Sequence, residues 1–93
     1  MNIELTQDGS SKGRFTAHEG DQQLGEMTFS RAGATMIIID HTDVSDAARG
    51  RGVGQALFEH MVAWARREGV KVMPLCPFTR GMFERHPEAR DVL

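Results

Sequence analysis

Apolar and polar residues alternate in four short stretches of the first half of the chain: 2–6, 14–19, 24–31 and 35–44. Alternation with a period of two is typical of strands that bury one face. Turn-forming residues separate the stretches, at Asp8-Gly9-Ser10-Ser11, Glu19-Gly20-Asp21 and Ala32-Gly33-Ala34. Because connections this short join only antiparallel neighbours, we predict a four-stranded antiparallel meander.

The fourth stretch differs from the others at its start. Met36 to Ile39 are all apolar, so both faces of a strand here carry hydrophobic side chains. A strand that is apolar on both faces is typical of the centre of a sheet with both faces covered. We therefore expect this strand to be central and covered on both faces.

From about Gly50 the period of the pattern changes. Val53, Leu57, Met61 and Trp64 recur at helical spacing, and Gly69 follows the exposed residues that close the segment. This predicts an amphipathic helix of about four turns with a glycine C-cap.

The remaining chain contains one further strand and one short helix. Residues 70–75 are β-prone, and residues 78–85 lie between Pro77 and Pro87, which bound a brief helix. Because a strand, a helix and a strand form a right-handed crossover, the fifth strand should be parallel to the fourth. The predicted class is α+β: an antiparallel meander with one parallel strand, a crossover helix packed on the sheet, and a short C-terminal helix.

The composition fits one small globular domain. The chain has 93 residues, of which 40% are hydrophobic and 26% charged, so we expect a single domain over 1–93. Cys76 is the only cysteine, which excludes an internal disulfide and a multi-cysteine zinc site. Apart from His41, the histidines are His18, His60 and His86. They show no metal-ligand spacing with one another, and we expect no metal. With no targeting segment and no stretch of roughly 18 apolar residues, we expect a cytoplasmic protein with no membrane partner. We also expect a monomer.

Charge is distributed unevenly along the chain. Residues 1–46 contain three basic and eight acidic side chains, whereas residues 47–93 contain eight and five. An anionic partner should therefore dock on the second half. A nucleic-acid or protein adaptor that uses the basic residues of 49–51 and 66–71 is an alternative, but Glu59 and Glu68 interrupt these clusters, so we expect no nucleic acid.

A glycine-rich turn, Arg49-Gly50-Arg51-Gly52-Val53-Gly54, connects the fourth strand to the long helix. Helix N-termini carry unpaired N–H groups and partial positive charge, so glycines and arginines here favour an anion site. The alternative is a tight turn that only permits close packing. A Walker loop is excluded because Gly54 is followed by Gln55-Ala56, and a G-x-G-x-x-G fingerprint because Gln55 occupies the last position.

The pattern Arg49-x-x-Gly52-x-Gly54 resembles the pyrophosphate motif Q/R-x-x-G-x-G/A of the GCN5-related N-acetyltransferase (GNAT) superfamily. The similarity continues through HTDVSDAARGRGVGQAL and KVMPLCPFTRGMFERHPEARDVL. Over residues 36–93 the chain is similar to the small single-domain GNAT-like subfamily, with its HTEV, RGxGxG, PLCPF and HPE segments in this order. The resemblance implies acetyl-CoA as a co-substrate.

The same resemblance implies where the coenzyme binds. The pantetheine arm would insert between the fourth and fifth strands and pair with backbone groups of Asp43, Val44 and Ser45. The pyrophosphate would be wrapped by the turn, that is by Arg49, Gly50, Arg51, Gly52, Val53 and Gly54. The Gln55 side chain either reaches a phosphate or is an exposed helix residue with no role.

Two residues are candidates for catalysis. Cys76 is either a small buried hydrophobe or, at the carboxyl end of a parallel strand and before a helix, a reactive thiol near the thioester. His41 corresponds to the histidine of HTEV and is either the base that accepts a proton from an incoming amine or a sheet histidine satisfied by a neighbour.

The chain departs from larger family members in two ways. It has only short turns where they have two helices that shape the acceptor pocket, and it contains no tyrosine to protonate the leaving thiolate. Two hypotheses follow: an acetyltransferase that moves acetyl from acetyl-CoA to an amine or protein acceptor, or a coenzyme A-binding module without transferase activity.

Overall fold

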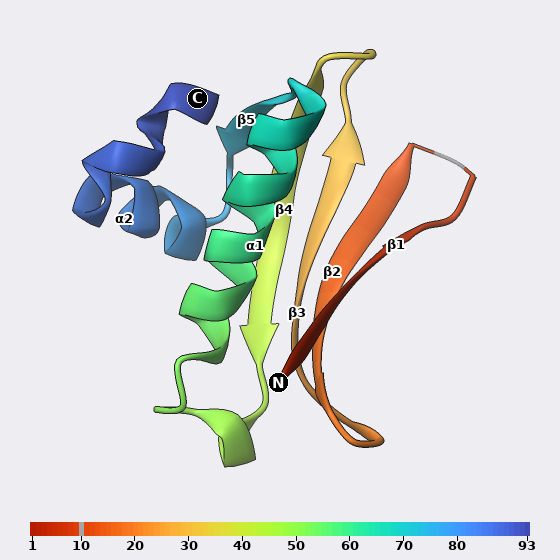
Figure 1. Ribbon diagram of the computed structural model, residues 1–93, viewed down its shortest axis with the longest axis vertical. Helices are drawn as coiled ribbons and strands as arrows, with labels where there is room; N and C mark the ends of the chain where they lie inside the picture. The colour runs from red at the N-terminus through yellow and green to blue at the C-terminus, as the bar shows by residue number, and fades with distance from the viewer. Residues whose placement is uncertain (10) are drawn as a thin grey trace.

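The computed structural model describes residues 1–9 and 11–93 (Figure 1). One sheet contains all five strands in chain order: β1 (Asn2–Gln7), β2 (Lys12–Glu19), β3 (Gln22–Arg31), β4 (Met36–Val44) and β5 (Lys71–Pro74). Strands β1 to β4 pair antiparallel, and β5 runs parallel to β4. The helices are α1 (Val53–Glu68) and α2 (Pro77–Arg85), with 3-10 turns η1 (Asp46–Ala48) and η2 (Pro87–Val92). The predicted α+β architecture is confirmed.

Most predicted boundaries agree with the structure to within two residues. Strand β2 begins at Lys12, two residues before the predicted start, and α2 includes Pro77. The 3-10 turns η1 and η2 were not predicted. Ser10, part of the predicted turn at 8–11, lies outside the described residues.

Helix α1 crosses one face of the sheet and forms the core with it (Figure 1). Phe15 of β2 and Phe29 of β3 contact Trp64 of α1, with ring centroids 5.7 and 5.9 Å away. Gly69 ends the helix with φ 70°, and its N–H donates to the carbonyls of Ala65 and Arg66. The amphipathic pattern of the sequence therefore corresponds to a stripe of α1 that faces the sheet.

The expectation that β4 is covered on both faces is wrong. Ile37 and Ile39 are fully buried beneath α1, whereas Ile38 is only partly buried and Met73, beside it on β5, is 42% exposed. Helix α2 packs beside α1, with the Phe58 and Phe83 rings 5.0 Å apart, and leaves the opposite face uncovered. We call this uncovered side of the sheet the open face.

A β-bulge interrupts β4. In the pairing with β3, Thr28 is opposite His41 but Phe29 is opposite Ile39, so Asp40 has no partner. An extra residue shifts the alternation of a strand by one position. The side chains of Asp40 and His41 are consequently both exposed, although they are neighbours in sequence.

An ion pair between Arg66 and Asp91 connects α1 to the C-terminal turn η2. Arg66 Nη2 lies 2.6 Å from Asp91 Oδ1, and Arg66 Nε donates to Asp91 Oδ2 at 2.8 Å. Lys71 Nζ donates to the Asp91 carbonyl oxygen at 2.8 Å. These contacts hold the end of the chain over the junction of α1 and β5.

Candidate functional site

Strands β4 and β5 separate at the β-bulge. Their last paired residues are Ile39 and Pro74, and the Ile39 carbonyl accepts the N–H groups of Leu75 and Cys76, both at 3.2 Å. Strand β4 continues to Val44 with no strand paired on this side in the described part of the chain. We call the side of β4 from Thr42 to Val44 that faces away from β3 the free edge.

The β-bulge determines which backbone groups face the free edge. The N–H of Ser45 donates to the Leu24 carbonyl at 2.8 Å, so it belongs to the β3 side. Backbone groups alternate between the two edges of a strand, which places Asp43 toward β3 as well and directs Thr42 and Val44 to the free edge. The backbone groups of Val44 therefore face the free edge, whereas those of Asp43 and the Ser45 N–H face β3. The extra residue in β4 is the reason.

Ser45 has a side-chain hydroxyl group next to the free edge. Its Oγ atom is buried and has no hydrogen-bond partner among the described residues. A buried hydroxyl without a partner costs stability, so such atoms in native proteins call for an explanation such as a ligand or water. The coenzyme that the resemblance implies would supply polar groups here.

The glycine turn exposes the N-terminus of α1. Gly52 is the N-cap with φ 77°, and no side chain caps the helix. Gly50 has φ 83°, and a Cβ atom on Gly50 or Gly52 would meet nothing within 4 Å. The first N–H groups of α1 are therefore open to an anion, and the left-handed backbone that opens them favours glycine.

The other two members of the turn are packing residues. The Val53 side chain is buried, with its Cγ1 atom 3.1 Å from the position of a Cβ on Gly25. A Cβ on Gly54 would lie 2.7 Å from the Cζ atom of Phe78. Val53 and Gly54 can therefore offer only backbone N–H groups to an anion.

Both arginines of the turn are already paired with carboxylates. Arg49 Nε lies 3.0 Å from Asp46 Oδ1, and both groups are strongly exposed. Arg51 Nη2 donates to both carboxylate oxygens of Glu19 at 2.8 Å, and this hydrogen bond and the positive charge of Arg51 lower the pKa of Glu19. A phosphate at the turn would compete with Glu19 for Arg51.

The Gln55 side chain points along the helix. Its Nε2 atom donates to Glu59 Oε1 at 3.1 Å. A side chain held by Glu59 is what the alternative of an exposed helix residue with no role predicts, so only the backbone N–H of Gln55 is left for an anion.

Cys76 lies where β5 passes into α2. The residue is 4% exposed and is the N-cap of α2, and its thiol donates to the Thr42 hydroxyl at 3.5 Å. Burial raises the pKa of the thiol, but hydrogen bonds from the Thr42 side chain and from the backbone N–H groups of Thr79 and Phe78 hold it below its ordinary value. The Cys76 thiolate next to the free edge is thus better stabilised than that of an ordinary cysteine.

His41 lies on the other side of β4. Its side chain is exposed on the open face, and its carbonyl oxygen accepts the Thr28 hydroxyl at 3.5 Å. Thr42, the next residue, points to the covered face and contacts Cys76. His41 and Cys76 therefore both lie next to Thr42, but on opposite faces of the sheet. The two candidate catalytic residues do not contact each other.

Two features of this region escaped the sequence analysis: the contact of Thr42 with Cys76 and the β-bulge at Asp40. The consecutive polar residues Asp40 and His41, directly after an apolar run, break the alternation and are the signal for the bulge. Among the residues that the structure describes, no group of three or more His, Cys, Asp or Glu could hold a metal ion. Within the same ranges no helix is long and apolar enough to cross a membrane.

Comparison with known proteins identifies the family of this chain. The family model described as GCN5-related N-acetyl-transferase matches residues 14–92. The chain belongs to the GCN5-related N-acetyltransferase family. The solution structure of a GCN5-like protein from Staphylococcus aureus superposes on this GNAT domain with a TM-score of 0.69 at 35% identity, covering 98% of this chain and 87% of that chain.

Other solved structures share the fold at lower identity. The GNAT domain of S. lividans PAT matches with a TM-score of 0.62 and 25% identity, over 90% of this chain and 53% of that chain. AAC(6')-Iy, solved with the bisubstrate analogue CoA-S-monomethyl-acetylneamine, matches with a TM-score of 0.57 and 16% identity, over 85% and 60%. None of the curated proteins compared with the chain matches it.

Proposed function

We propose that this GNAT domain binds acetyl-CoA and transfers the acetyl group to an amine. One observation carries the proposal: an uncapped helix N-terminus with open glycines at Gly50 and Gly52 directly follows the free edge of β4, beside which Cys76 lies. Such a strand, turn and helix offers an amide-binding edge and an anion site in sequence. Pantetheine and pyrophosphate follow one another in the same order in coenzyme A.

We propose a role for each of these residues in holding one part of the coenzyme. The turn, at Arg49, Gly50, Arg51, Gly52, Val53, Gly54 and Gln55, would hold the pyrophosphate through backbone N–H groups, with Arg49 and Arg51 adding charge. Thr42 and Val44 would pair with the pantetheine amides, and the unpartnered Ser45 Oγ would gain a hydrogen-bond partner. The backbone groups of Asp43 face β3, so Asp43 would lie beside the pantetheine arm without a backbone hydrogen bond to it.

In the direct route, the amine attacks the carbonyl carbon of the thioester. An N–C bond forms as the C–S bond breaks, and the two protons that the ammonium loses go to the leaving thiolate and to His41 or water. A backbone N–H at the free edge would polarise the carbonyl. Since His41 lies on the open face, the amine would arrive from that side.

A second route uses Cys76 as a nucleophile. Its thiolate attacks the thioester carbon, the acetyl group moves to Sγ as coenzyme A leaves, and the amine then takes the acetyl group and returns the thiolate. Exchange between two sulfurs is close to balanced because the attacking and leaving groups are alike. The lowered pKa of Cys76 and its place next to the free edge support this route.

The alternative function is a coenzyme A-binding module without turnover. Its specific support is the lack of tyrosine in the chain, which leaves the leaving thiolate without the acid used by larger relatives. We propose, in either case, a cytoplasmic monomer.

Release of coenzyme A separates the two functions. Purified protein is incubated with acetyl-CoA and an amine, and the released coenzyme A and the acetylated amine are quantified by chromatography. Calorimetry measures acetyl-CoA binding in parallel. Binding with amine-dependent release supports the transferase, binding without release supports the module, and absence of binding contradicts both.

A further inference from the structure

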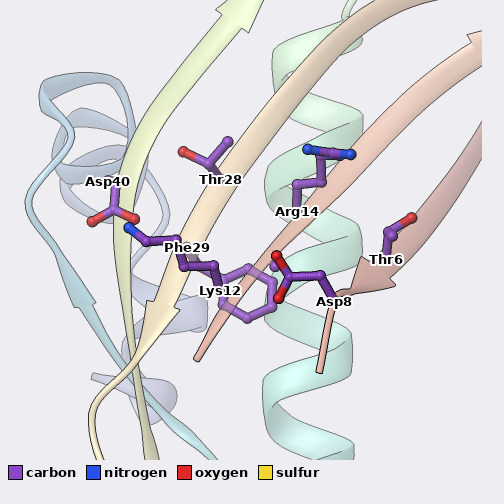
Figure 2. Close-up of a pocket in the computed structure, with 8 residues that line it drawn as sticks. Thr6, Asp8, Lys12, Arg14, Thr28, Phe29 and Asp40 are labelled. Atoms are coloured by element: carbon purple, nitrogen blue, oxygen red, sulfur yellow. The ribbon is translucent and has the colours of Figure 1, made fainter. Parts of the chain in front are cut away.

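The open face of the sheet contains a pocket that the proposed function has not used (Figure 2). It has a volume of about 390 Å³, which lies in the range of small-molecule sites. Its lining combines side chains of both charges with hydroxyl groups: Thr6, Asp8, Lys12, Gly13, Arg14, Thr28, Phe29 and Asp40. A lining with both signs of charge fits a ligand that carries both signs.

Arg14 is the cationic side chain best placed for a carboxylate. It lies in register between Thr6 of β1 and Thr28 of β3, as Figure 2 shows. Among the described residues, the ion pairs of Arg49, Arg51, Arg66 and His86 do not include Arg14. A guanidinium flanked by two hydroxyls matches the planar, bidentate geometry of a carboxylate.

Asp40 is the acidic side chain of the pocket that lies on β4, next to His41. It is the extra residue of the β-bulge and follows Ile39, whose carbonyl binds the N–H of Cys76. Its Oδ2 atom accepts the Ser30 hydroxyl at 3.0 Å, which orients the carboxylate on the open face. An ammonium bound at Asp40 would lie beside the point where β4 and β5 separate.

We propose that this pocket is the acceptor site and that the acceptor is a short amino carboxylate, with its carboxylate on Arg14 and its reacting amine at Asp40. This inference rests on the proposed acetyl transfer. Because β3 separates β2 from β4, the two strands are roughly 10 Å apart. The carboxylate and the amine are therefore separated by a chain of several carbons, as in an ω-amino acid, and not by one carbon.

Acetyl transfer to this acceptor follows the direct route, in which the amine attacks the thioester. The acceptor arrives as a zwitterion, and its ammonium releases two protons, one to the coenzyme A thiolate and one to His41 or water, as the amide forms. The product keeps its carboxylate but has lost the positive charge. Asp40 then no longer holds a cation, which favours release of the product from this end.

The test compares two amines that differ in one group. The probes are 6-aminohexanoate and hexylamine, which share chain length and amine but not the carboxylate, and acetyl-CoA is the donor. We expect a KM for 6-aminohexanoate at least about tenfold below that for hexylamine. Arg14→Gln should raise the KM for 6-aminohexanoate roughly 10- to 100-fold and leave hexylamine unchanged. Arg67→Gln, an exposed arginine on α1 outside the pocket, is the matched control.

A binding readout keeps this inference separate from the proposed function. Amide NMR of the protein with 6-aminohexanoate should shift Thr6, Arg14 and Thr28, and Arg14→Gln should remove these shifts. Shifts without acetylation of either amine would support binding of an amino carboxylate in the pocket and would contradict both acetyl transfer and the pocket's role as acceptor site. Equal KM values for the two amines, or an unchanged KM for 6-aminohexanoate in Arg14→Gln, would overturn the amino-carboxylate site. Neither result would contradict acetyl transfer.

Discussion

Gly54 and Phe78 are in such close contact that a Cβ atom on Gly54 would lie 2.7 Å from the Cζ atom of the Phe78 ring. The contact joins the first turn of α1 to the first turn of α2. Cys76, two residues before Phe78, is thereby positioned relative to the glycine turn. Gly54 in this GNAT domain is needed for packing, whereas Gly50 and Gly52 are needed for backbone conformation and access.

This distinction predicts two different responses to substitution. Gly54→Ala should lower the free energy of unfolding by about 1–3 kcal/mol because the ring must move, and Phe78→Leu in the same chain should recover part of the loss. Gly52→Ala should cost about 1–2 kcal/mol through its left-handed φ, with no recovery from Phe78→Leu. Urea unfolding of the four variants measures both effects. Equal recovery in the two backgrounds would contradict the assignment.

Competition between Glu19 and a phosphate for Arg51 is also testable. Arg51→Ala should weaken acetyl-CoA binding by about 1–3 kcal/mol, as for a charge-assisted hydrogen bond. Glu19→Gln should instead strengthen binding, because the guanidinium no longer has to leave a carboxylate. The control is Glu68→Gln, which removes the same charge at the opposite end of α1. Calorimetry decides, and weaker binding by Glu19→Gln would show that the pair positions Arg51 for the phosphate.

The hydrogen bonds to Cys76 predict the pH at which the thiol becomes reactive. Because they hold its pKa below the ordinary 9.0, the alkylation rate with iodoacetamide should reach half its maximum below pH 9. Thr42→Val should move this midpoint upward by removing one hydrogen bond to the thiolate. Thr28→Val, on the open face, serves as control. A midpoint that does not respond to Thr42→Val would contradict the contact.

Intact-mass analysis after incubation with acetyl-CoA separates the two catalytic routes. The relay predicts one added acetyl group on the wild type and none on Cys76→Ser. Direct attack predicts turnover with no adduct and makes His41 the base, so that His41→Gln slows turnover and Cys76→Ser does not. Loss of turnover in neither variant would exclude both residues.

The contact between Arg66 and Asp91 gives stability a defined pH dependence. The hydrogen bond from Arg66 lowers the pKa of Asp91 below its ordinary 3.8. Stability from this group is therefore present above pH 3.8 and is lost as the pH falls through the lowered value. Asp91→Asn should lower the urea midpoint at pH 7, and the difference from the wild type should shrink at pH 2 to 3. A difference that stays constant with pH would contradict the ion pair.

The sequence predicts the elements of this fold well because each has a distinct pattern. Val53, Leu57, Met61 and Trp64 define α1, and Gly69 ends it. The coverage of β4 was predicted wrongly because apolar residues on both faces do not require two covering layers in a sheet near its edge. Ile38 and its neighbour Met73 stay partly exposed in a chain that has no further helix for that face in its described residues.

The site was predicted less completely for a physical reason. The motif identifies the turn, but a single extra residue at Asp40 decides which backbone groups reach the free edge. Strand register depends on pairing with Thr28 and Phe29, which lie more than ten residues away, so a local pattern cannot show that Thr42, and not Asp43, faces the free edge. The contact of Gly54 with Phe78 likewise joins distant segments and has no local signal.

Coenzyme binding at β4 and the glycine turn is tested most directly by a titration of labelled protein with acetyl-CoA followed by amide NMR. The largest shifts should fall on Thr42, Val44, residues 49–55 and the start of α2 at Cys76 to Phe78, while β1 stays unchanged. Desulfo-coenzyme A, which lacks the thioester, should give the same shifts at 49–55 but smaller ones at Cys76. Shifts confined to other elements, or none at saturating acetyl-CoA, would contradict the placement of the coenzyme and with it the proposed function.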